Sequence, residues 1–260
     1  MRSQEHKIRV NGSDYFFDLY VPENNRHPSA AIFLHGAFCS KSQYTHLGAA
    51  ISNKGMVVAI PDMPGHGKTT SEFSMPEAVE STQELTNFLR ARYNAEKVGV
   101  GGYSVGARVA FEVGAKTRSA DALAIASMPR KPIDYVGNYS TAALRARGEI
   151  RSDNGIVRAR QLHTRNIKET YNRFAEIEDA IGLVDVVEAP VLFMYGFDFH
   201  VKQSDNYSVF TEMERRGKSV TRAYVGRMSG QLMEKELKRL GKETASYFAK
   251  TFEEPSRVRT

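Results

Sequence analysis

The strongest chemical signal in the sequence is the segment Gly102-Tyr103-Ser104-Val105-Gly106. It follows a short apolar run, Val98–Gly101, and opens a stretch with helical periodicity. A strand, a serine-centred turn and a helix in this order form the context that a nucleophile elbow requires. The glycines fit this context, because a sharp turn leaves no room for side chains beside the serine. Such a turn would hold the Ser104 hydroxyl clear of the sheet edge.

Two further loops follow apolar runs earlier in the chain. His35-Gly36-Ala37-Phe38 comes directly after Ala30–Leu34, and Pro61-Asp62-Met63-Pro64-Gly65-His66-Gly67 comes directly after Val57–Ile60. Together with the serine motif, these segments stand in the order and at the spacing found in the α/β-hydrolase family. From about residue 15 to residue 252 the chain resembles the members of that family that carry a cap.

The resemblance implies that Ser104 is a nucleophile and that backbone N–H groups form an oxyanion hole beside it. One donor would be Val105, and the second would be Ala37 or Phe38. Two fixed donors where negative charge develops typically contribute a few kcal/mol of transition-state stabilisation. Three neighbouring residues are expected to contact the substrate: Tyr103, Met128 and Met228. Three polar residues of the earlier loops are expected to brace those loops: His35, Asp62 and His66.

The acid is expected after the apolar run Val191–Tyr195, where the chain reads Gly196-Phe197-Asp198-Phe199-His200. Members of the family commonly carry the acid three residues after the glycine, whereas Asp198 is two residues after it. A loop that is one residue shorter would bring Asp198 to the acid position. We therefore predict Asp198 as the catalytic acid, with an ordinary turn carboxylate as the alternative.

The base is the point at which the sequence departs from the family. The segment after the last apolar run reads Tyr224-Val225-Gly226-Arg227-Met228-Ser229-Gly230, and no histidine follows His200. Met228 stands where the family carries its histidine. A thioether has no titratable nitrogen, so it cannot take the serine proton. The usual relay of acid, imidazole and serine therefore cannot be assembled from residues in their standard places.

Four explanations stay open. His200 is our candidate base, because strand ends of a parallel sheet converge at one edge and bring neighbouring loops close to Ser104. His163 could instead descend from an inserted segment. The site could lack an efficient base, and then bind a ligand or catalyse a reaction other than hydrolysis. Finally, Met228 could be an introduced substitution.

Alternating apolar runs and helical patterns must position these motifs. Asn11-Gly12 is a turn signal between two strand-like runs and predicts an antiparallel hairpin. Six near-continuous apolar runs are typical of parallel strands covered on both faces. The alternation predicts an α/β fold, namely a mostly parallel eight-stranded sheet with helices on both faces. Strands are expected at Lys7–Val10, Tyr15–Val21, Ala30–Leu34, Val57–Ile60, Val98–Gly101, Leu123–Ala126, Val191–Tyr195 and Val220–Val225, and helices at Lys41–Asn53, Pro76–Tyr93, Val105–Lys116, Ser204–Arg216 and Gln231–Thr251, the fourth of these followed by Gly217 as a C-cap.

One interval interrupts this alternation. Between Ala126 and Val191 lie 64 residues, far more than an ordinary connection. Helical patterns at Thr141–Arg147, Ile156–Thr164 and Ile167–Ile181 predict an inserted helical cap. We therefore expect a core of residues 1–127 and 186–260 and a basic cap of residues 128–185.

The positive charge of the chain is concentrated in this interval. The 36 basic and 30 acidic residues give a formal charge of +6. Residues 128–173 hold ten basic and four acidic residues, so the rest of the chain is neutral. A concentrated positive field attracts anions and favours an anionic substrate, with a solvated helical face as the alternative. Because few aromatic residues are interleaved, nucleic acid is not an expected partner.

The composition is that of a soluble globular chain, with 41% hydrophobic and 25% charged residues. The single Cys39 excludes an intrachain disulfide and fits a reducing compartment. No apolar run approaches the ~18–20 residues of a membrane span, and the first residues lack the apolar stretch of a secretory signal. A cytoplasmic protein is therefore expected. The sequence contains neither a metal-ligand spacing nor a complete dinucleotide fingerprint, so no metal or cofactor is expected.

These observations predict a serine hydrolase that acts on an ester, thioester or related acyl bond of a small, anionic substrate. One alternative is a catalytically degenerate relative that binds a ligand or a partner protein. Another is a lyase or cyclase on the same scaffold. Fold alone cannot choose among the three, because this scaffold carries many functions.

Overall fold

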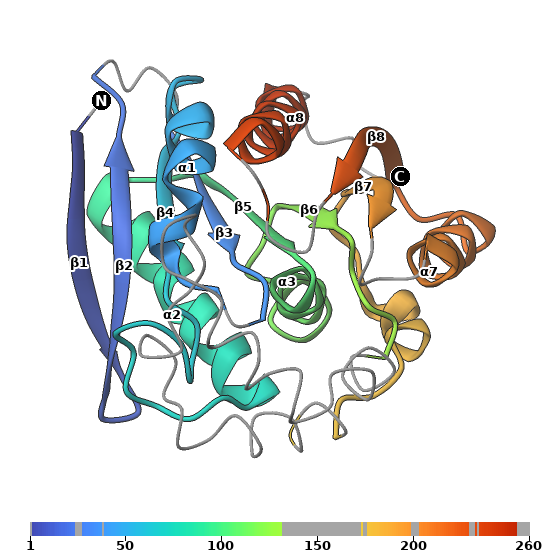
Figure 1. Ribbon diagram of the computed structural model, residues 1–260, viewed down its shortest axis with the longest axis horizontal. Helices are drawn as coiled ribbons and strands as arrows, with labels where there is room; N and C mark the ends of the chain where they lie inside the picture. The colour runs from blue at the N-terminus through green and yellow to red at the C-terminus, as the bar shows by residue number, and fades with distance from the viewer. Residues whose placement is uncertain are drawn as a thin grey trace.

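Eight strands form one sheet in the order β1-β2-β4-β3-β5-β6-β7-β8 (Figure 1). The computed structural model describes residues 2–23, 28–37, 39–131, 173, 176–198, 203–228, 232 and 234–253. The strands are β1 (Arg2–Val10), β2 (Ser13–Val21), β3 (Ser29–Leu34), β4 (Val57–Pro61), β5 (Lys97–Tyr103), β6 (Ala122–Ala126), β7 (Val191–Asp198) and β8 (Val220–Met228). All eight predicted strands are present. Each is longer than predicted, most of all β1, which begins at Arg2 instead of Lys7, followed by β5, β7 and β8.

The sheet is mostly parallel, as predicted. β1 and β2 form the predicted antiparallel hairpin, whose turn residues Asn11 and Gly12 have φ angles of 48° and 80°. Two successive positive φ angles are typical of the tight turn that Asn-Gly favours. β2 also runs antiparallel to β4, and the pairs from β4 through β8 are parallel. The carboxyl ends of β3, β5, β6, β7 and β8 therefore meet at one edge.

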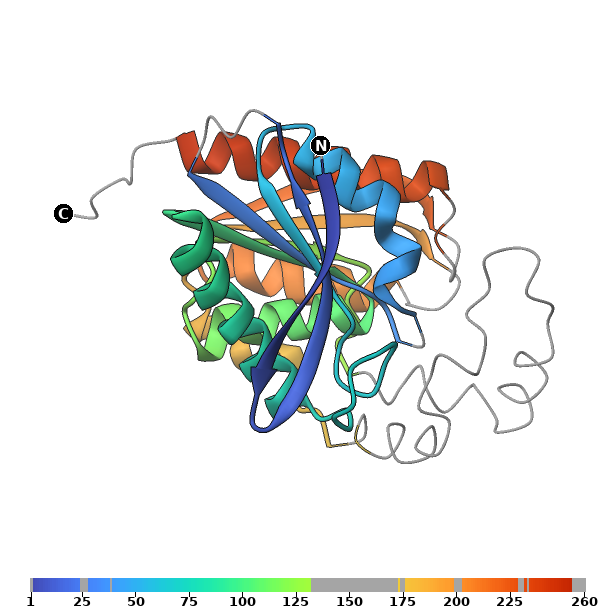
Figure 2. The same cartoon turned by 90° about the vertical axis from the view of Figure 1, so that its left-hand side faces the viewer.

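Helices cover both faces of the sheet, and each face has its own apolar core. Figure 2 shows α1 and α8 on one side of the sheet and α2, α3 and α7 on the other. The bounds are α1 (Thr45–Ser52), α2 (Met75–Tyr93), α3 (Val105–Lys116), α7 (Gln203–Arg215) and α8 (Glu234–Glu253), with short 3-10 helices η1 (Lys41–Tyr44) and η5 (Ala180–Val186). Gly217 follows α7 with a φ of 68°, as predicted for a C-cap.

The two ends of the predicted cap are bound to each other, and the downstream end packs against the core. Arg130 binds Asp179 through two nitrogens, with 2.7 Å from Nε to Oδ1 and 2.6 Å from Nη2 to Oδ2. Downstream of this pair, η5 packs against α3 and α7, with Ala180 and Val184 buried. The predicted helices Thr141–Arg147 and Ile156–Thr164, and most of Ile167–Ile181, lie outside the described residues. The division into core and cap stays a prediction.

Candidate active site

Ser104 occupies the single-residue turn between β5 and α3. Its backbone has φ 54° and ψ −120°, a conformation that is costly for any residue with a side chain. Its N–H donates to the Ala126 carbonyl oxygen at 2.9 Å, which ties the turn to the end of β6. A Cβ atom on Gly102 would lie 2.3 Å from the carbonyl of Gly106. The sequence therefore needs glycine at this position, because the helix begins directly against the strand.

The loop between β3 and η1, called the β3–η1 loop below, passes beside this turn. A Cβ atom on Gly36 would lie 3.6 Å from the Ser104 Cβ and 3.2 Å from the Tyr103 ring. The Gly36 N–H donates to the Tyr44 hydroxyl at 3.1 Å, and the Cys39 N–H donates to the Gly36 carbonyl at 3.2 Å. The N–H groups of Gly36 and Cys39 are thus occupied, and the predicted oxyanion donor Ala37 follows Gly36 in this loop. Phe38 lies outside the described residues.

The other predicted donor, Val105, is the first residue of α3. The first N–H groups of a helix have no acceptor within the helix, and they lie at its positive end. A developing negative charge next to Ser104 is therefore favoured at this position. The role of Val105 as an oxyanion donor stays a prediction.

His35 braces the β3–η1 loop, as expected. Its Nδ1 lies 2.8 Å from the Gly36 carbonyl oxygen, and its Nε2 accepts the Met63 N–H at 3.1 Å. These two partners select the neutral ring with the proton on Nδ1. Burial lowers the pKa of His35 to about 4, so the ring stays neutral. His66 is also buried, and its Nδ1 lies 2.7 Å from the Pro64 carbonyl oxygen.

Asp62 braces two loops at once. Its Oδ1 accepts the Lys41 N–H at 2.8 Å and its Oδ2 accepts the Lys68 N–H at 2.9 Å. Burial raises the pKa of this carboxyl above its usual range, although both N–H donors oppose the shift. A Cβ atom on Gly67 would collide with the carboxylate at about 2 Å, so the glycine of the Pro-Gly-His-Gly segment makes room for Asp62.

Asp198 and Met228 end neighbouring strands. Asp198 is the last residue of β7, rather than a loop residue as predicted, and its register partner is Met228, the last residue of β8. The strand continues because Gly196 permits a close approach, since a Cβ atom there would lie 1.8 Å from the Gly226 carbonyl oxygen. Met228 is fully buried. The position that the family resemblance assigns to histidine is thus filled by a thioether at the same sheet edge as Ser104.

Ser127 was missed by sequence reasoning. It follows β6 with a φ of 47°, is fully buried, and donates from its hydroxyl to the Met228 Sδ at 3.5 Å. Its N–H donates to the Met194 carbonyl oxygen at 3.3 Å. The available signal was its place directly after a predicted strand, one residue before Met128. A positive φ at a serine cannot be foreseen from composition.

A buried ion pair one turn beyond Ser104 was also missed. Arg108 Nη2 lies 3.0 Å from Glu112 Oε1, both side chains are buried, and the same nitrogen donates to the Glu178 carbonyl oxygen at 2.9 Å. This contact links α3 to the chain that leads back from the predicted cap. The sequence signal for this ion pair was the presence of two oppositely charged residues, four positions apart, in an otherwise apolar helix.

Some of the remaining predicted residues are described by the structure, and others are not. Tyr103 and Met128 are buried, and their substrate contact stays a prediction. Burial raises the pKa of the Cys39 thiol to about 12, in keeping with an unreactive thiol. His163, His200 and seven of the ten basic residues of the 128–173 segment lie outside the described residues.

The described part of the chain shows neither a membrane-spanning helix nor a cluster of metal ligands. None of its helices is long and apolar enough to cross a bilayer. Within the same residues, no three His, Cys, Asp or Glu side chains gather in a way that would hold a metal ion.

Two solved structures share the fold along nearly the whole chain. Est1E from Butyrivibrio proteoclasticus with bound ferulic acid has a TM-score of 0.71 at 15% identity, covering 96% of this chain and 100% of that one. A thioesterase domain from the curacin biosynthetic pathway has a TM-score of 0.68 at 12% identity, covering 97% and 100%. At these identities the likeness concerns the fold alone.

Two curated relatives match shorter segments. Protein PHYLLO, chloroplastic, from Arabidopsis thaliana is 28% identical over 122 residues, and a probable alcohol acetyltransferase from Cyberlindnera fabianii is 36% identical over 81 residues. The matches cover 43% and 31% of this chain but 7% and 22% of the relatives' lengths. The model of the alpha/beta hydrolase family matches residues 31–225. The sheet order, the serine turn and this match all agree. The chain belongs to the alpha/beta hydrolase family.

Proposed function

We propose that this chain is a serine hydrolase that acts on an ester or thioester of a small acyl compound. The observation that carries the proposal is the backbone of Ser104. A strained turn persists only where surrounding structure enforces it, and such strain is typical of functional positions. Here the turn places a serine at the positive end of α3 and beside the β3–η1 loop.

In the proposed reaction, Ser104 Oγ attacks the substrate carbonyl carbon and loses its proton to a base. The carbonyl oxygen becomes negative and is held by the N–H of Val105 and that of Ala37 or Phe38. Collapse of this intermediate breaks the acyl bond and releases the alcohol or thiol, which takes up the proton. Water then attacks the acyl-serine by the same steps in reverse and releases the acid.

The base in this proposal is His200, with Asp198 as the acid that orients it. Asp198 ends β7 two residues before His200, and β7 lies beside β6, whose last residue binds the Ser104 N–H. Asp198 therefore belongs to the edge that carries the nucleophile, and His200 follows it by two residues in the sequence. His163 of the predicted cap is the alternative base. With either histidine as the base, Met228 does not have to take a proton.

The proposed substrate class rests on the names of the similar proteins and on the positive charge of residues 128–173. One structural neighbour is named as a thioesterase domain, another binds ferulic acid, and one curated relative is named as a probable alcohol acetyltransferase. The names of the thioesterase and the acetyltransferase describe acyl groups on sulfur and on oxygen. The basic segment of residues 128–173 favours a substrate that carries a carboxylate or phosphate.

A second candidate is a protein that binds an acyl compound without turnover. The observation in its favour is Met228, which is buried at the end of β8 and accepts a hydrogen bond from Ser127. A side chain that is packed and bonded in this way does not leave its place free for an imidazole.

Covalent labelling tests the proposal. The full chain and its Ser104→Ala variant are treated with a fluorophosphonate, and the modified residue is identified by mass spectrometry. Rapid labelling of Ser104 that disappears in the variant supports the hydrolase, and His200→Ala and His163→Ala then identify the base. A folded parent chain that stays unlabelled would refute the hydrolase and favour the binding protein.

A further inference from the structure

The β3–η1 loop is anchored at both of its ends. At the upstream end, Gly36 is held by the His35 ring and by the Tyr44 hydroxyl, as described above. The downstream end is Lys41, the first residue of η1. Ala37 lies between these anchors, so its position depends on both.

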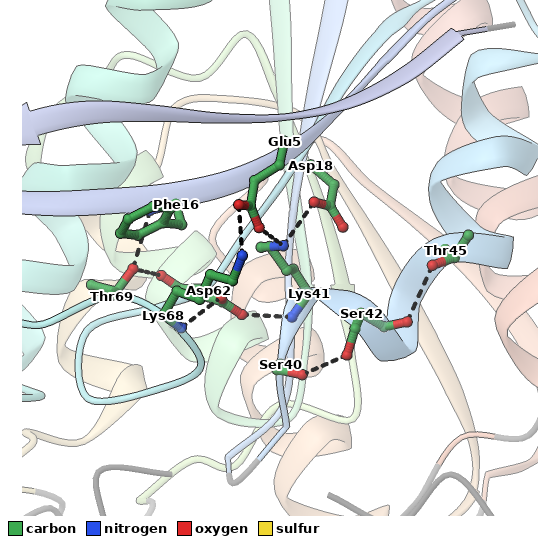
Figure 3. Close-up of polar contacts among 10 residues, drawn as sticks. All are labelled: Glu5, Phe16, Asp18, Ser40, Lys41, Ser42, Thr45, Asp62, Lys68 and Thr69. Atoms are coloured by element: carbon green, nitrogen blue, oxygen red, sulfur yellow. Dashed lines mark hydrogen bonds and ion pairs between the residues drawn. The ribbon is translucent and has the colours of Figure 1, made fainter. Parts of the chain in front are cut away.

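The side chain of Lys41 joins the loop to the first two strands (Figure 3). Its Nζ lies 2.8 Å from Glu5 Oε2 on β1 and 2.8 Å from Asp18 Oδ1 on β2. The Lys41 side chain is only 9% exposed, whereas those of Glu5 and Asp18 are 36% and 21% exposed, so solvent screens these ion pairs only in part. Its hydrogen bonds to Glu5 and Asp18 outweigh the effect of burial and raise the pKa of Lys41.

The backbone of Lys41 is held by a different carboxylate. Its N–H donates to Asp62 Oδ1, while Asp62 Oδ2 takes the Lys68 N–H from the following loop (Figure 3). Residue 41 is thus fixed twice, through its backbone by Asp62 and through its side chain by Glu5 and Asp18. A lysine held in both ways cannot shift without breaking several charged hydrogen bonds.

Lys41 also balances charge for a buried acid. The Asp62 side chain is almost fully buried, and the positive charge of Lys41 favours its ionised form whereas Asp18 disfavours it. Removing the ammonium group would leave Asp18 and Asp62 close together without this cation. An uncompensated buried charge is strongly unfavourable, so the Asp62 carboxylate would weaken as an acceptor for the Lys41 N–H.

We propose that Lys41 is a positioning residue for the reaction at Ser104, because it fixes the downstream end of the β3–η1 loop and thereby the oxyanion donor in that loop. The inference rests on the proposed function, since it assigns a catalytic purpose to the loop. Lys41 itself does not touch the substrate in this scheme. Its effect reaches Ser104 through the loop backbone.

Lys41→Met tests this role, because methionine keeps the aliphatic stem and removes the cation. The matched control is Lys68→Met. Lys68 Nζ binds the same Glu5 at 2.7 Å, but its side chain is 61% exposed and Lys68 is not part of the β3–η1 loop. Lys41→Arg is the conservative variant, because it keeps a cation. Two readouts are used on the full chain: the rate of fluorophosphonate labelling of Ser104, and amide hydrogen exchange of residues 35–45.

We expect Lys41→Met to lower the maximal labelling rate about tenfold to a hundredfold, because a displaced donor loses much of its effect. The probe concentration at half-maximal rate should change little, and Lys41→Arg should recover most of the rate. Exchange of residues 35–45 should become faster in Lys41→Met and stay unchanged in Lys68→Met. Unchanged exchange in Lys41→Met, or equal labelling of Lys41→Met and Lys68→Met, would overturn the inference. If the parent chain is not labelled at all, the proposed function fails, and hydrogen exchange alone decides whether Lys41 anchors the loop.

Discussion

Met228 lies directly beside Asp198, because the two residues end adjacent parallel strands and are register partners. The acid and base of a serine hydrolase must be neighbours, since the acid orients the imidazole. In this chain the side chain that ends the strand next to the candidate acid is a thioether, which neither donates nor accepts a proton. Its sulfur is instead the acceptor for the buried Ser127 hydroxyl.

In a chain that carries His200→Ala, Met228→His should raise the labelling rate of Ser104 by about a hundredfold, because a positioned general base typically contributes that much and the proposed base has been removed. The rate should increase with pH through the pKa of the new imidazole. Met228→Leu in the same His200→Ala chain is the control, since it removes the sulfur and adds no base, and it should leave the rate near that of His200→Ala alone. Equal rates for the histidine and leucine variants would show that position 228 cannot serve as the base position.

Ser104→Gly should be more stable than Ser104→Ala. Both variants lack the hydroxyl, but only glycine adopts φ 54° and ψ −120° without steric conflict. The expected difference in free energy of unfolding is about 1–2 kcal/mol in favour of glycine. Urea denaturation of the two variants measures it. A Ser104→Ala variant as stable as Ser104→Gly would mean that the turn relaxes when the hydroxyl is lost.

His35 should make stability depend on pH. Burial lowers its pKa to about 4 in the folded chain, whereas an unfolded histidine titrates near 6.5. Between these values the unfolded chain binds more protons, so the stabilisation is complete above about pH 6.5 and is lost as the pH falls toward 4. The loss attributable to this residue approaches about 3 kcal/mol.

Unfolding free energies at several pH values between 5 and 7 check this expectation. His35→Gln should flatten the dependence, although it lowers stability overall. The difference in slope between the parent chain and His35→Gln isolates the contribution of this residue. A His35→Gln variant with the parental pH dependence would assign the effect to other groups.

Gly102→Ala should destabilise the chain by more than about 3 kcal/mol, because its Cβ would lie 2.3 Å from backbone atoms that cannot move aside. Gly182→Ala is the matched control, since a Cβ atom there meets nothing within 4 Å. The control should change the thermal midpoint by little. Similar midpoints for the two variants would mean that β5 and α3 separate more easily than their contact suggests.

The architecture could be predicted from the sequence because its signals are local. Each buried strand is a short apolar run, Asn11-Gly12 has the backbone freedom that a tight turn requires, and glycines flank Ser104 where two elements meet. The ends of β7 and β8 were predicted too early. Gly196 and Gly226 usually signal a turn, but here Gly196 permits a close approach that extends the pairing to Asp198 and Met228.

The polar contacts of the site could not be predicted in the same way. The pairing of Lys41 with Glu5 and Asp18 joins residues 36 and 23 positions apart, and no local pattern encodes such a distance. The Ser127 contact spans 101 positions and pairs a hydroxyl with a thioether, a combination that has no sequence signature. Only the fold brings these groups together.

The close contact of Gly196 with the Gly226 carbonyl restricts how this chain can evolve. β8 carries one extra residue at this point, because Tyr195 pairs with Tyr224 whereas Gly196 pairs with Gly226, and pairing resumes beyond this bulge only because no side chain at 196 collides with β8. Gly226 has a φ of 70°, which favours glycine as well. Lineages that gain or lose a histidine at position 228 should therefore keep both glycines.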